Sequence, residues 1–390
     1  MCRVYNKNGG VKLKKKARKL TLISIVIILL IFTACSNNEN QVDVAEDKIK
    51  EVEDKIKFEY NDDVEVHGNI KFTVNPKIES TYMAVKMLEK ETGFTNYRIS
   101  GGYIGAGQEW LKDYKTHEFI KLLEDMIKNN YQYDAIPTTL HYFDDNFELR
   151  NDIEFDEFNV SRAGGMDKLQ RLVSHLKDFM EDSDLKSFFN KYEDFYIERM
   201  QKGQERVHDK EVEKIINGFY GHPIDEALVT VTPLSMNAYG SSVLRKDGIL
   251  EVKPTMDVFD NEKLFVSILI HEISHTYVNP LTAENIDKVN KTDALFEPIR
   301  DIMARQAYPI WEYAVNEHIV RANTALMMGQ IYGESECESE LSKNRNEGFM
   351  YIDDIAKSIV YYSQNRDKYP EFEGYYLEII KLLEDLNGDS

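Results

Sequence analysis

The chain has 390 residues, of which 42% are hydrophobic and 30% are charged. A hydrophobic share of this size predicts a folded protein with a sizeable core rather than a disordered chain. The formal net charge is −20 at pH 7. So acidic a chain is a poor ligand for nucleic acid, because phosphate contacts need clustered Lys and Arg.

The first 34 residues resemble the signal peptide of a bacterial lipoprotein. They carry eight Lys or Arg and no Asp or Glu, and residues 20–34 are an apolar run. A run of this length is shorter than the ~20 residues of a membrane span and is typical of a signal peptide. It ends in FTAC, similar to a lipobox, so we expect Cys35 to carry a lipid anchor. The alternative is an uncleaved signal anchor; both place the body outside the cytoplasm, tethered to the cell membrane.

Residues 35–65 are polar and charged, which is typical of a linker. Residues 66–386 are then the expected folded domain, which can be divided further into a helical part, 66–220, and a catalytic part, 221–386. Once the signal peptide is removed, only Cys35 and Cys337 remain. These are too few for a cysteine zinc site or a disulfide framework.

The sequence of this domain predicts an α+β fold, mostly helical, with a small antiparallel or mixed sheet. Residues 69–75 alternate like a strand, and residues 227–236 and 242–253 are rich in β-branched side chains. Asp247-Gly248 predicts a hairpin turn, and Pro233 predicts that the strand holding it lies at a sheet edge. Amphipathic helical spacing is present at residues 78–92, 109–130, 166–202 and 205–219.

Residues 260–280 (DNEKLFVSILIHEISHTYVNP) predict a helix that begins after Asp260 or Asn261 and ends at Asn279-Pro280. The segment is apolar nearly all round, so we expect this helix to be buried beside the small sheet. Placing imidazoles and a carboxylate on a buried helix is unfavourable unless a partner binds them.

His271 and His275 are one helical turn apart, so their imidazoles project from the same face and can bind one metal ion. Imidazole nitrogen is a good ligand for zinc. Glu272 is placed beside the metal, where it can accept a proton from a bound water. This is the HExxH pattern of zinc hydrolases. The alternative is a pair of hydrogen-bonded core histidines.

Catalytic zinc usually has three protein ligands and one open position. Residues 310–328 predict a second long helix, closed by Gly329, and Glu317 lies on its apolar stripe together with Tyr313 and Arg321. We expect Glu317 to be the third ligand, with Arg321 supporting it; the alternative is a simple Glu317–Arg321 ion pair.

Three other residues compete for the third ligand position. Glu297 is nearer in sequence but precedes a proline in an expected turn. His318 faces about 100° away from Glu317 on the helix. Glu312 is expected to face solvent.

The HExxH segment 271–280 and the later segment 316–322 resemble gluzincin-type zinc metallopeptidases. Together with residues 72–79 (FTVNPKIE), they are similar to a bacterial family, domain of unknown function 4932. The likeness covers residues 66–330.

This resemblance implies one zinc ion bound by His271, His275 and Glu317, with Glu272 as the base. It also implies a zincin-like fold, in which the active-site helix lies beside a small sheet whose edge strand lines an extended substrate. The interval between His275 and Glu317 is longer than in well-studied gluzincins.

The expected function is therefore hydrolysis of peptide bonds in a peptide or protein substrate. A tetrahedral intermediate needs a further donor, and the candidates are Tyr239, Tyr313, His318 and Arg321. Substrate is expected to add as a strand against residues 228–236. One alternative is a non-catalytic zinc-containing surface or solute-binding lipoprotein; another is a hydrolase of non-peptide bonds, such as an amide of the cell wall.

Overall fold

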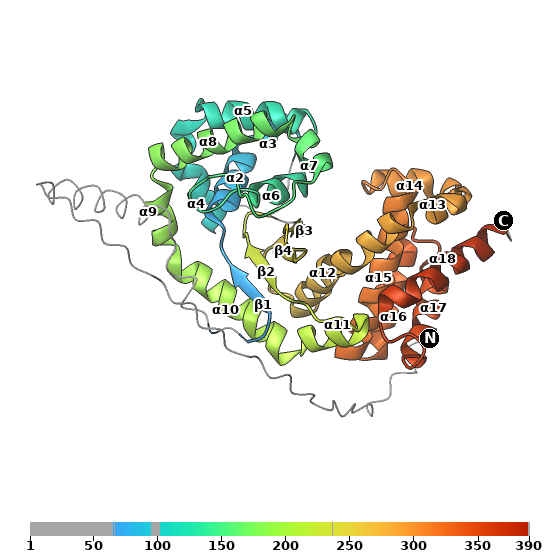
Figure 1. The fold of residues 1–390 in the computed structure, drawn as a ribbon. Coiled ribbons are helices and arrows are strands. Elements are labelled where there is room, and N and C mark those ends of the chain that lie inside the picture. Colours follow the sequence, from blue (N-terminus) through green and yellow to red (C-terminus); the bar gives the residue numbers. More distant parts are fainter. Residues whose placement is uncertain (1–64, 66, 95–101, 236, 389–390) are drawn as a thin grey trace, which may run out of the picture. The chain divides into compact units, whose positions relative to one another are not determined.

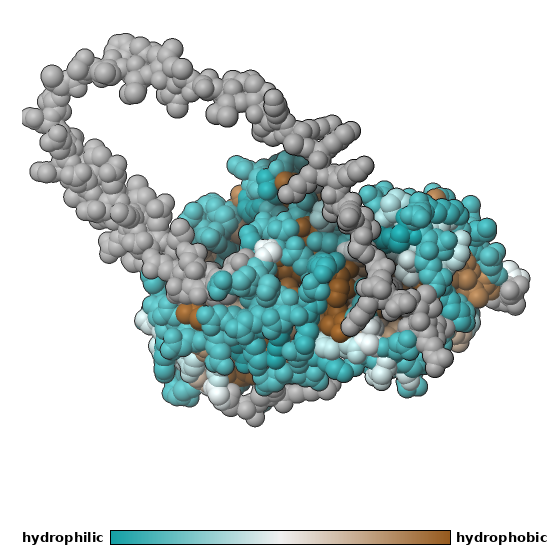
Figure 2. All heavy atoms as spheres, turned by 90° about the horizontal axis from the view of Figure 1, so that it is seen from below, coloured by the Kyte–Doolittle hydropathy of each residue, from teal (hydrophilic) through white to brown (hydrophobic). Residues whose placement is uncertain are grey.

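The computed structural model describes residues 65, 67–94, 102–235 and 237–388, which all belong to one compact unit. The expected signal peptide, Cys35 and nearly all of the expected linker lie outside the described residues. Within the described ranges, every helix is too short or too polar to cross a lipid bilayer. The face shown in Figure 2 is mostly hydrophilic, with small hydrophobic areas between the charged side chains.

A mixed sheet of four strands lies at the centre of this unit, in the order β1-β2-β4-β3. The strands are β1 (Ile70–Thr73), β2 (Ala227–Val231), β3 (Tyr239–Leu244) and β4 (Leu250–Met256). The pairs β1–β2 and β2–β4 are parallel, whereas β3 and β4 form an antiparallel hairpin around Asp247-Gly248. Because β1 pairs with β2, residues before and after position 220 share one sheet.

The predicted hairpin and the small mixed sheet are confirmed, but the prediction that Pro233 marks an edge strand is wrong. Strand β2 ends at Val231, so Pro233 lies beyond the hydrogen-bonded ladder. The strand itself lies between β1 and β4. The edge strand on the hairpin side of the sheet is β3.

Helices fill the interval between β1 and β2, and several of the predicted helices are broken into shorter ones. The helical elements are α2 (Pro76–Met87), α3 (Glu89–Thr92), α4 (Gly102–Trp110), η2 (Lys112–Tyr114), α5 (Glu118–Lys128), α6 (Ala135–Leu140), α7 (Glu157–Arg162), α8 (Met166–Asp182), α9 (Leu185–Lys191), α10 (Glu193–Asp209) and α11 (Val212–Tyr220). Two of the breaks fall where a single residue takes left-handed backbone angles, Asp184 at φ 48° and Glu211 at φ 51°. The Asp184 side chain then caps α9 by accepting from the Ser187 N–H.

The C-terminal half is almost entirely helical and contains the two long helices that hold the site. Its elements are α12 (Glu262–Glu284), α13 (Ile286–Val289), η3 (Asn290–Ile299), α14 (Arg300–Arg305), α15 (Trp311–Tyr332), α16 (Glu334–Asn346), α17 (Ile352–Gln364) and α18 (Phe372–Gly388). Helix α12 packs along α15 on one side and against β3 and β4 on the other (Figure 1).

Both long helices continue past the residues predicted to end them. Helix α12 passes through Pro280 because its last turn is held from outside, where Thr282 hydrogen-bonds Asn316 and Tyr376. Helix α15 passes through Gly329, where a Cβ would lie 2.7 Å from the Cβ of Cys337. This glycine therefore allows α16 to pack closely, and the helix ends only before Gly333.

A buried carboxylate joins the N-terminal helices to the sheet. Glu79 of α2 is fully buried and accepts hydrogen bonds from the hydroxyls of Tyr103 on α4 and Thr232 after β2. Burial raises the pKa of Glu79 to about 7, although the two hydroxyl donors oppose this shift. At pH values between 4.5 and 7 this carboxyl therefore takes up a proton on folding.

We predict that Glu79→Gln removes a pH dependence of stability. Because the folded-state pKa is raised from 4.5 to about 7, the stability contribution of Glu79 is fully present below pH 4.5 and is lost as pH rises to 7. The shift corresponds to about 3 kcal/mol. Urea unfolding at pH 5 and pH 8 measures the effect. Between these two pH values, the free energy of unfolding of the variant should rise by that amount relative to that of the wild type. Parallel pH profiles for the two proteins would contradict the assignment.

Candidate metal centre

Helix α12 presents the HExxH residues from a well-anchored position. Its N-cap is Asn261, whose Oδ1 accepts a hydrogen bond from the Leu264 N–H at 3.2 Å. Asn261 is one of the two residues predicted for this position. The apolar residues Phe265, Leu269 and Ile273 are fully buried. The side chains of His271 and His275, in contrast, keep 19% and 16% of their surface exposed, so they lie at a solvent-accessible edge of the core.

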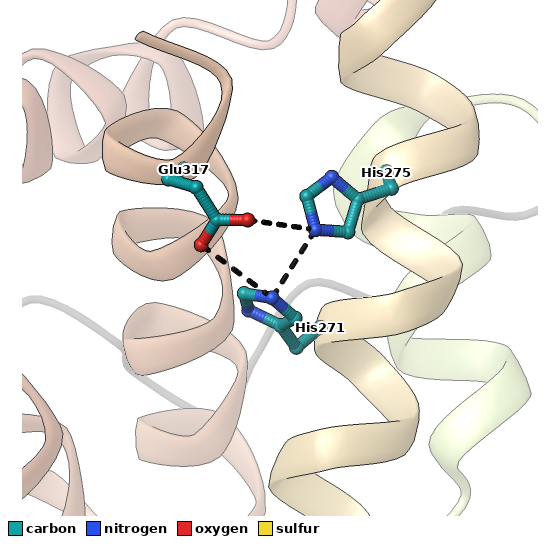
Figure 3. Close-up of side chains that lie close together, drawn as sticks. All are labelled: His271, His275 and Glu317. Carbon is teal, nitrogen blue, oxygen red and sulfur yellow. Dashed lines mark hydrogen bonds and ion pairs between the residues drawn. The ribbon is translucent and has the colours of Figure 1, made fainter. Parts of the chain in front are cut away.

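The predicted ligands His271, His275 and Glu317 converge on one point between α12 and α15 (Figure 3). The two Nε2 atoms are 3.2 Å apart, and they lie 3.7 Å and 3.3 Å from the two carboxylate oxygens of Glu317. Ligand atoms around a tetrahedral zinc ion with bonds of ~2.1 Å are about 3.4 Å apart. Each imidazole thus lies near a different oxygen of Glu317. When one ligand atom is taken from each residue, the three atoms lie within 4.8 Å of one another, so the group could hold a single metal ion.

The charges of this cluster are arranged to bind a cation. Burial alone would raise the pKa of Glu317, but His271, His275 and Arg321 outweigh it and hold the carboxylate ionised. Burial lowers the pKa of His271 to about 3, so this imidazole is neutral. Burial also disfavours a charged His275, yet the hydrogen bond and charge of Glu317 raise its pKa to about 9. A metal ion would therefore have to displace a proton from His275.

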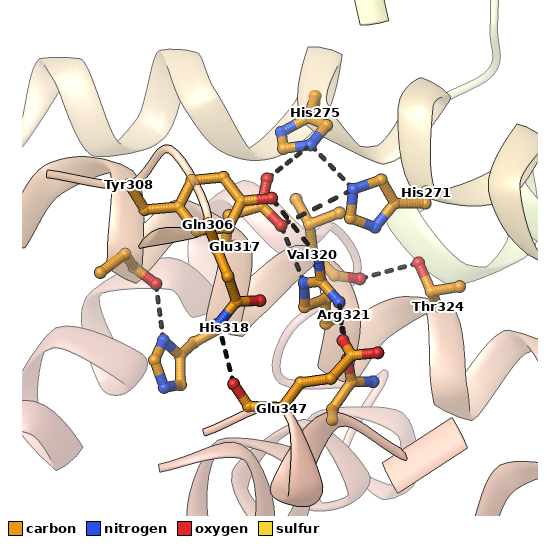
Figure 4. A network of polar contacts seen from close by, with 12 residues as sticks. His271, His275, Gln306, Tyr308, Glu317, His318, Val320, Arg321, Thr324 and Glu347 are labelled. Atoms are coloured by element: carbon orange, nitrogen blue, oxygen red, sulfur yellow. Dashed lines mark hydrogen bonds and ion pairs between the residues drawn. The ribbon is translucent and has the colours of Figure 1, made fainter. Parts of the chain in front are cut away.

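Neighbouring side chains orient two of the three ligands (Figure 4). Arg321 Nε donates to Glu317 Oε2 at 2.9 Å, and the same guanidinium donates to Asn344 and Glu347 of the α16 region at 2.8 Å and 3.1 Å. His275 Nδ1–H donates to Asn279 Oδ1 at 3.1 Å, which directs Nε2 toward the cluster. The Glu317–Arg321 pair is thus present together with the ligand cluster, and Arg321 has the supporting position predicted for it.

Glu272 lies beside the cluster, against the edge strand β3. Burial raises the pKa of Glu272 to about 7, and a hydrogen bond from the Gly240 backbone N–H opposes the shift. A Cβ on Gly240 would lie 2.9 Å from the Glu272 carbonyl oxygen and 3.0 Å from Oε2. Only glycine therefore allows β3 to approach the helix this closely.

The backbone of β3 alternates between the hairpin partner and the outer edge. Arg245 N–H donates to Ile249 O inside the hairpin, whereas Leu244 O accepts from Glu154 N–H outside it. Counting back in steps of two places the polar groups of Ser242 and Gly240 on the outer edge. Gly240 also faces Pro254, which has no N–H to donate. The strand-addition site predicted at residues 228–236 is wrong, because β2 is flanked on both sides.

The other predicted site residues lie in less direct positions. Tyr239 begins β3 and is buried. Tyr313 lies in α15 and is half-buried, and burial raises the pKa of its hydroxyl. His318 is buried and donates from Nδ1 to Ala314 O at 2.6 Å.

The competing third ligands are also placed elsewhere. His318 packs its ring against Phe349 and Tyr351, away from His271 and His275. Glu297 is paired with Arg300 at 2.9 Å and is mostly exposed. Glu312, which was predicted to face solvent, is partly exposed.

Tyr308 is the site residue that sequence reasoning missed. Its hydroxyl accepts a hydrogen bond from Arg321 at 3.4 Å and forms another with Glu317. Figure 4 shows Tyr308 within the network around these residues. It follows Ala307, which has a positive φ of 70°, in the loop before α15. Gln306 anchors this loop through a hydrogen bond to Glu347 O at 2.8 Å. The sequence carries no motif that distinguishes Tyr308 from the other 22 tyrosines.

The fold and the cluster together define a mostly helical α+β protein with a His-His-Glu group that could hold a metal ion. The chain belongs to the family described as Domain of unknown function (DUF4932), whose model matches residues 56–382. The match extends beyond residues 66–330, over which the sequence resemblance was drawn. No curated protein and no solved structure matches the chain.

Proposed function

We propose that this domain is a zinc-dependent metallopeptidase with a zincin-like active site. The observation that carries the proposal is the convergence of His271, His275 and Glu317, whose ligand atoms, one from each residue, lie within 4.8 Å of one another. Two imidazoles and a carboxylate are a ligand set that zinc accepts. Among the described residues the group has three members, whereas a structural zinc site has four protein ligands. This favours an enzyme over the alternative of a zinc-containing binding protein.

The neighbouring residues have the positions that hydrolysis of an amide requires. Zinc at this site would supply a Lewis acid that acidifies water and polarises a carbonyl. Glu272 would take the proton from the attacking water and pass it to the leaving amine. As donor to the developing oxyanion we favour the Tyr308 hydroxyl, because it lies beside the ligand Glu317. Its proton would have to turn from the Glu317 carboxylate to the oxyanion.

We further propose that a peptide substrate adds as a strand along the outer edge of β3. Ser242 and Gly240 direct their backbone groups to this edge, and Gly240 contacts Glu272. A peptide aligned there by main-chain hydrogen bonds passes directly in front of the base. Together with the lipobox at Cys35, this describes an extracytoplasmic, lipid-anchored peptidase.

The proposal is tested by metal analysis combined with a substrate panel. Purified protein should contain about one zinc per chain and should cleave peptides; a chelator should abolish cleavage, and added zinc should restore it. Cleavage of cell-wall fragments but not peptides would support the alternative hydrolase instead. Tightly bound zinc with no cleavage of either substrate class would favour the non-catalytic lipoprotein.

A further inference from the structure

Helices α12 and α16 are joined by a row of side-chain contacts that advances toward the metal centre. Lys263 pairs with Glu336, and one turn further along both helices Ser267 donates to Glu340 at 3.1 Å. The next turn of α12 carries His271, and the next turn of α16 carries Lys343 and Asn344. The helical register therefore places Lys343 beside the first histidine ligand.

A contact made by the next residue supports this placement. Asn344, the next residue on α16, accepts a hydrogen bond from Arg321, which also donates one to the ligand Glu317. Lys343 itself is exposed to solvent.

Lys343 has no ion-pair partner among the residues that the structure describes, and the reason lies in its neighbours. Glu347, one turn away, is engaged by Arg321 at 3.1 Å. Glu340, on the preceding turn, is engaged by Ser267. Arg345 is bound to Glu338 and Asp353, so it does not provide a second free charge here.

We propose that the Lys343 ammonium binds a carboxylate of the peptide substrate, either an acidic side chain or the free C-terminus. The inference deepens the proposed peptidase function by naming a substrate class and a specificity-determining residue. The chain has a net charge of −20, so an acidic peptide is repelled at long range. An unpaired cation at the site supplies the local attraction that such a peptide needs.

The test compares Lys343→Gln, Lys343→Glu and Lys343→Arg with the wild type. Each zinc-loaded protein is given a proteome-derived peptide library in two forms, with free and with amidated C-termini, and cleavage sites are read by mass spectrometry. The wild type should favour a carboxylate at one fixed position. This preference should fall about fivefold in the Gln variant, turn toward basic residues in the Glu variant and return in the Arg variant.

The two library forms identify the source of the carboxylate. Loss of cleavage on amidation indicates the C-terminus, whereas retained cleavage with a fixed Asp or Glu indicates a side chain. Lys121→Gln, an exposed and paired lysine on α5, is the matched control and should leave the profile unchanged. Identical profiles for the wild type and Lys343→Gln would overturn the inference.

A binding measurement separates this inference from the peptidase proposal. Fluorescent heptapeptides carrying one Glu, or one Gln at the same position, are titrated into the zinc-loaded Glu272→Gln protein with and without Lys343→Gln. The Glu peptide should bind about fivefold more tightly, and only while Lys343 is present. If the wild type cleaves no peptide, the proposed function fails. The role of Lys343 is rejected by a different result, equal binding of the Glu and Gln peptides.

Discussion

Replacing Glu272 with Gln should lower kcat/KM for peptide cleavage by about 10²- to 10⁴-fold, the range attributed to general acid–base catalysis. Gln has nearly the same shape and its oxygen can still accept from the Gly240 N–H, the contact that Glu272 makes. The amide cannot accept the proton of the attacking water. Zinc content, measured by mass spectrometry of the metal, should remain that of the wild type because Glu272 is not among the three ligand residues.

The matched control for this experiment is Glu297→Gln. Glu297 is an exposed carboxylate on η3 that pairs with Arg300 of the same segment, so activity and metal content should both be retained. Full activity of the Glu272 variant would eliminate it as the base. Loss of zinc together with activity would mean that the residue maintains the metal site rather than transferring a proton.

Replacing Glu317 with Gln should reduce zinc affinity by more than about 100-fold. Changes that remove only a supporting residue typically cost 10- to 100-fold in metal affinity, and loss of a ligand is more severe. The charge matters twice, because Glu317 also pairs with the partly buried Arg321 at 2.9 Å. We therefore expect a lower unfolding temperature in the metal-free variant as well, since this guanidinium loses one of its two carboxylate partners and keeps only Glu347.

Glu347→Gln separates these two effects. Glu347 also pairs with Arg321 but does not belong to the ligand group, so its loss should weaken zinc binding by less. Competition with a chromogenic chelator gives the two affinities, and thermal unfolding without metal gives the two stabilities. Equal zinc affinity for the Glu317 variant and the wild type would show that the third ligand is another residue.

The sequence by itself determined those features of the site that depend on the geometry of one helix. In any helix, residues four apart share a face, so His271 and His275 could be recognised as a pair without coordinates. The same rule connected Glu317 with Arg321. The Asp247-Gly248 turn is equally local, because its backbone angles favour these two residues.

Tertiary packing decided everything that joins distant segments. Strand β1 reaches its partner β2 across more than 150 residues of helical chain, and the order of the strands, not Pro233, made β2 central. Pro280 and Gly329 are helix breakers by local preference, but outside hydrogen bonds and close packing kept both helices continuous.

The same is true of the residues that complete the site. Tyr308 reaches Glu317 only because its loop is anchored to Glu347 through Gln306. Gly240 contacts Glu272 only because β3 packs against α12. The position proposed for Lys343 beside His271 likewise depends on contacts between two helices, Lys263 with Glu336 and Ser267 with Glu340. Local sequence encodes which groups can act, and packing between remote elements determines which of them meet, because no local rule specifies contacts across so many residues.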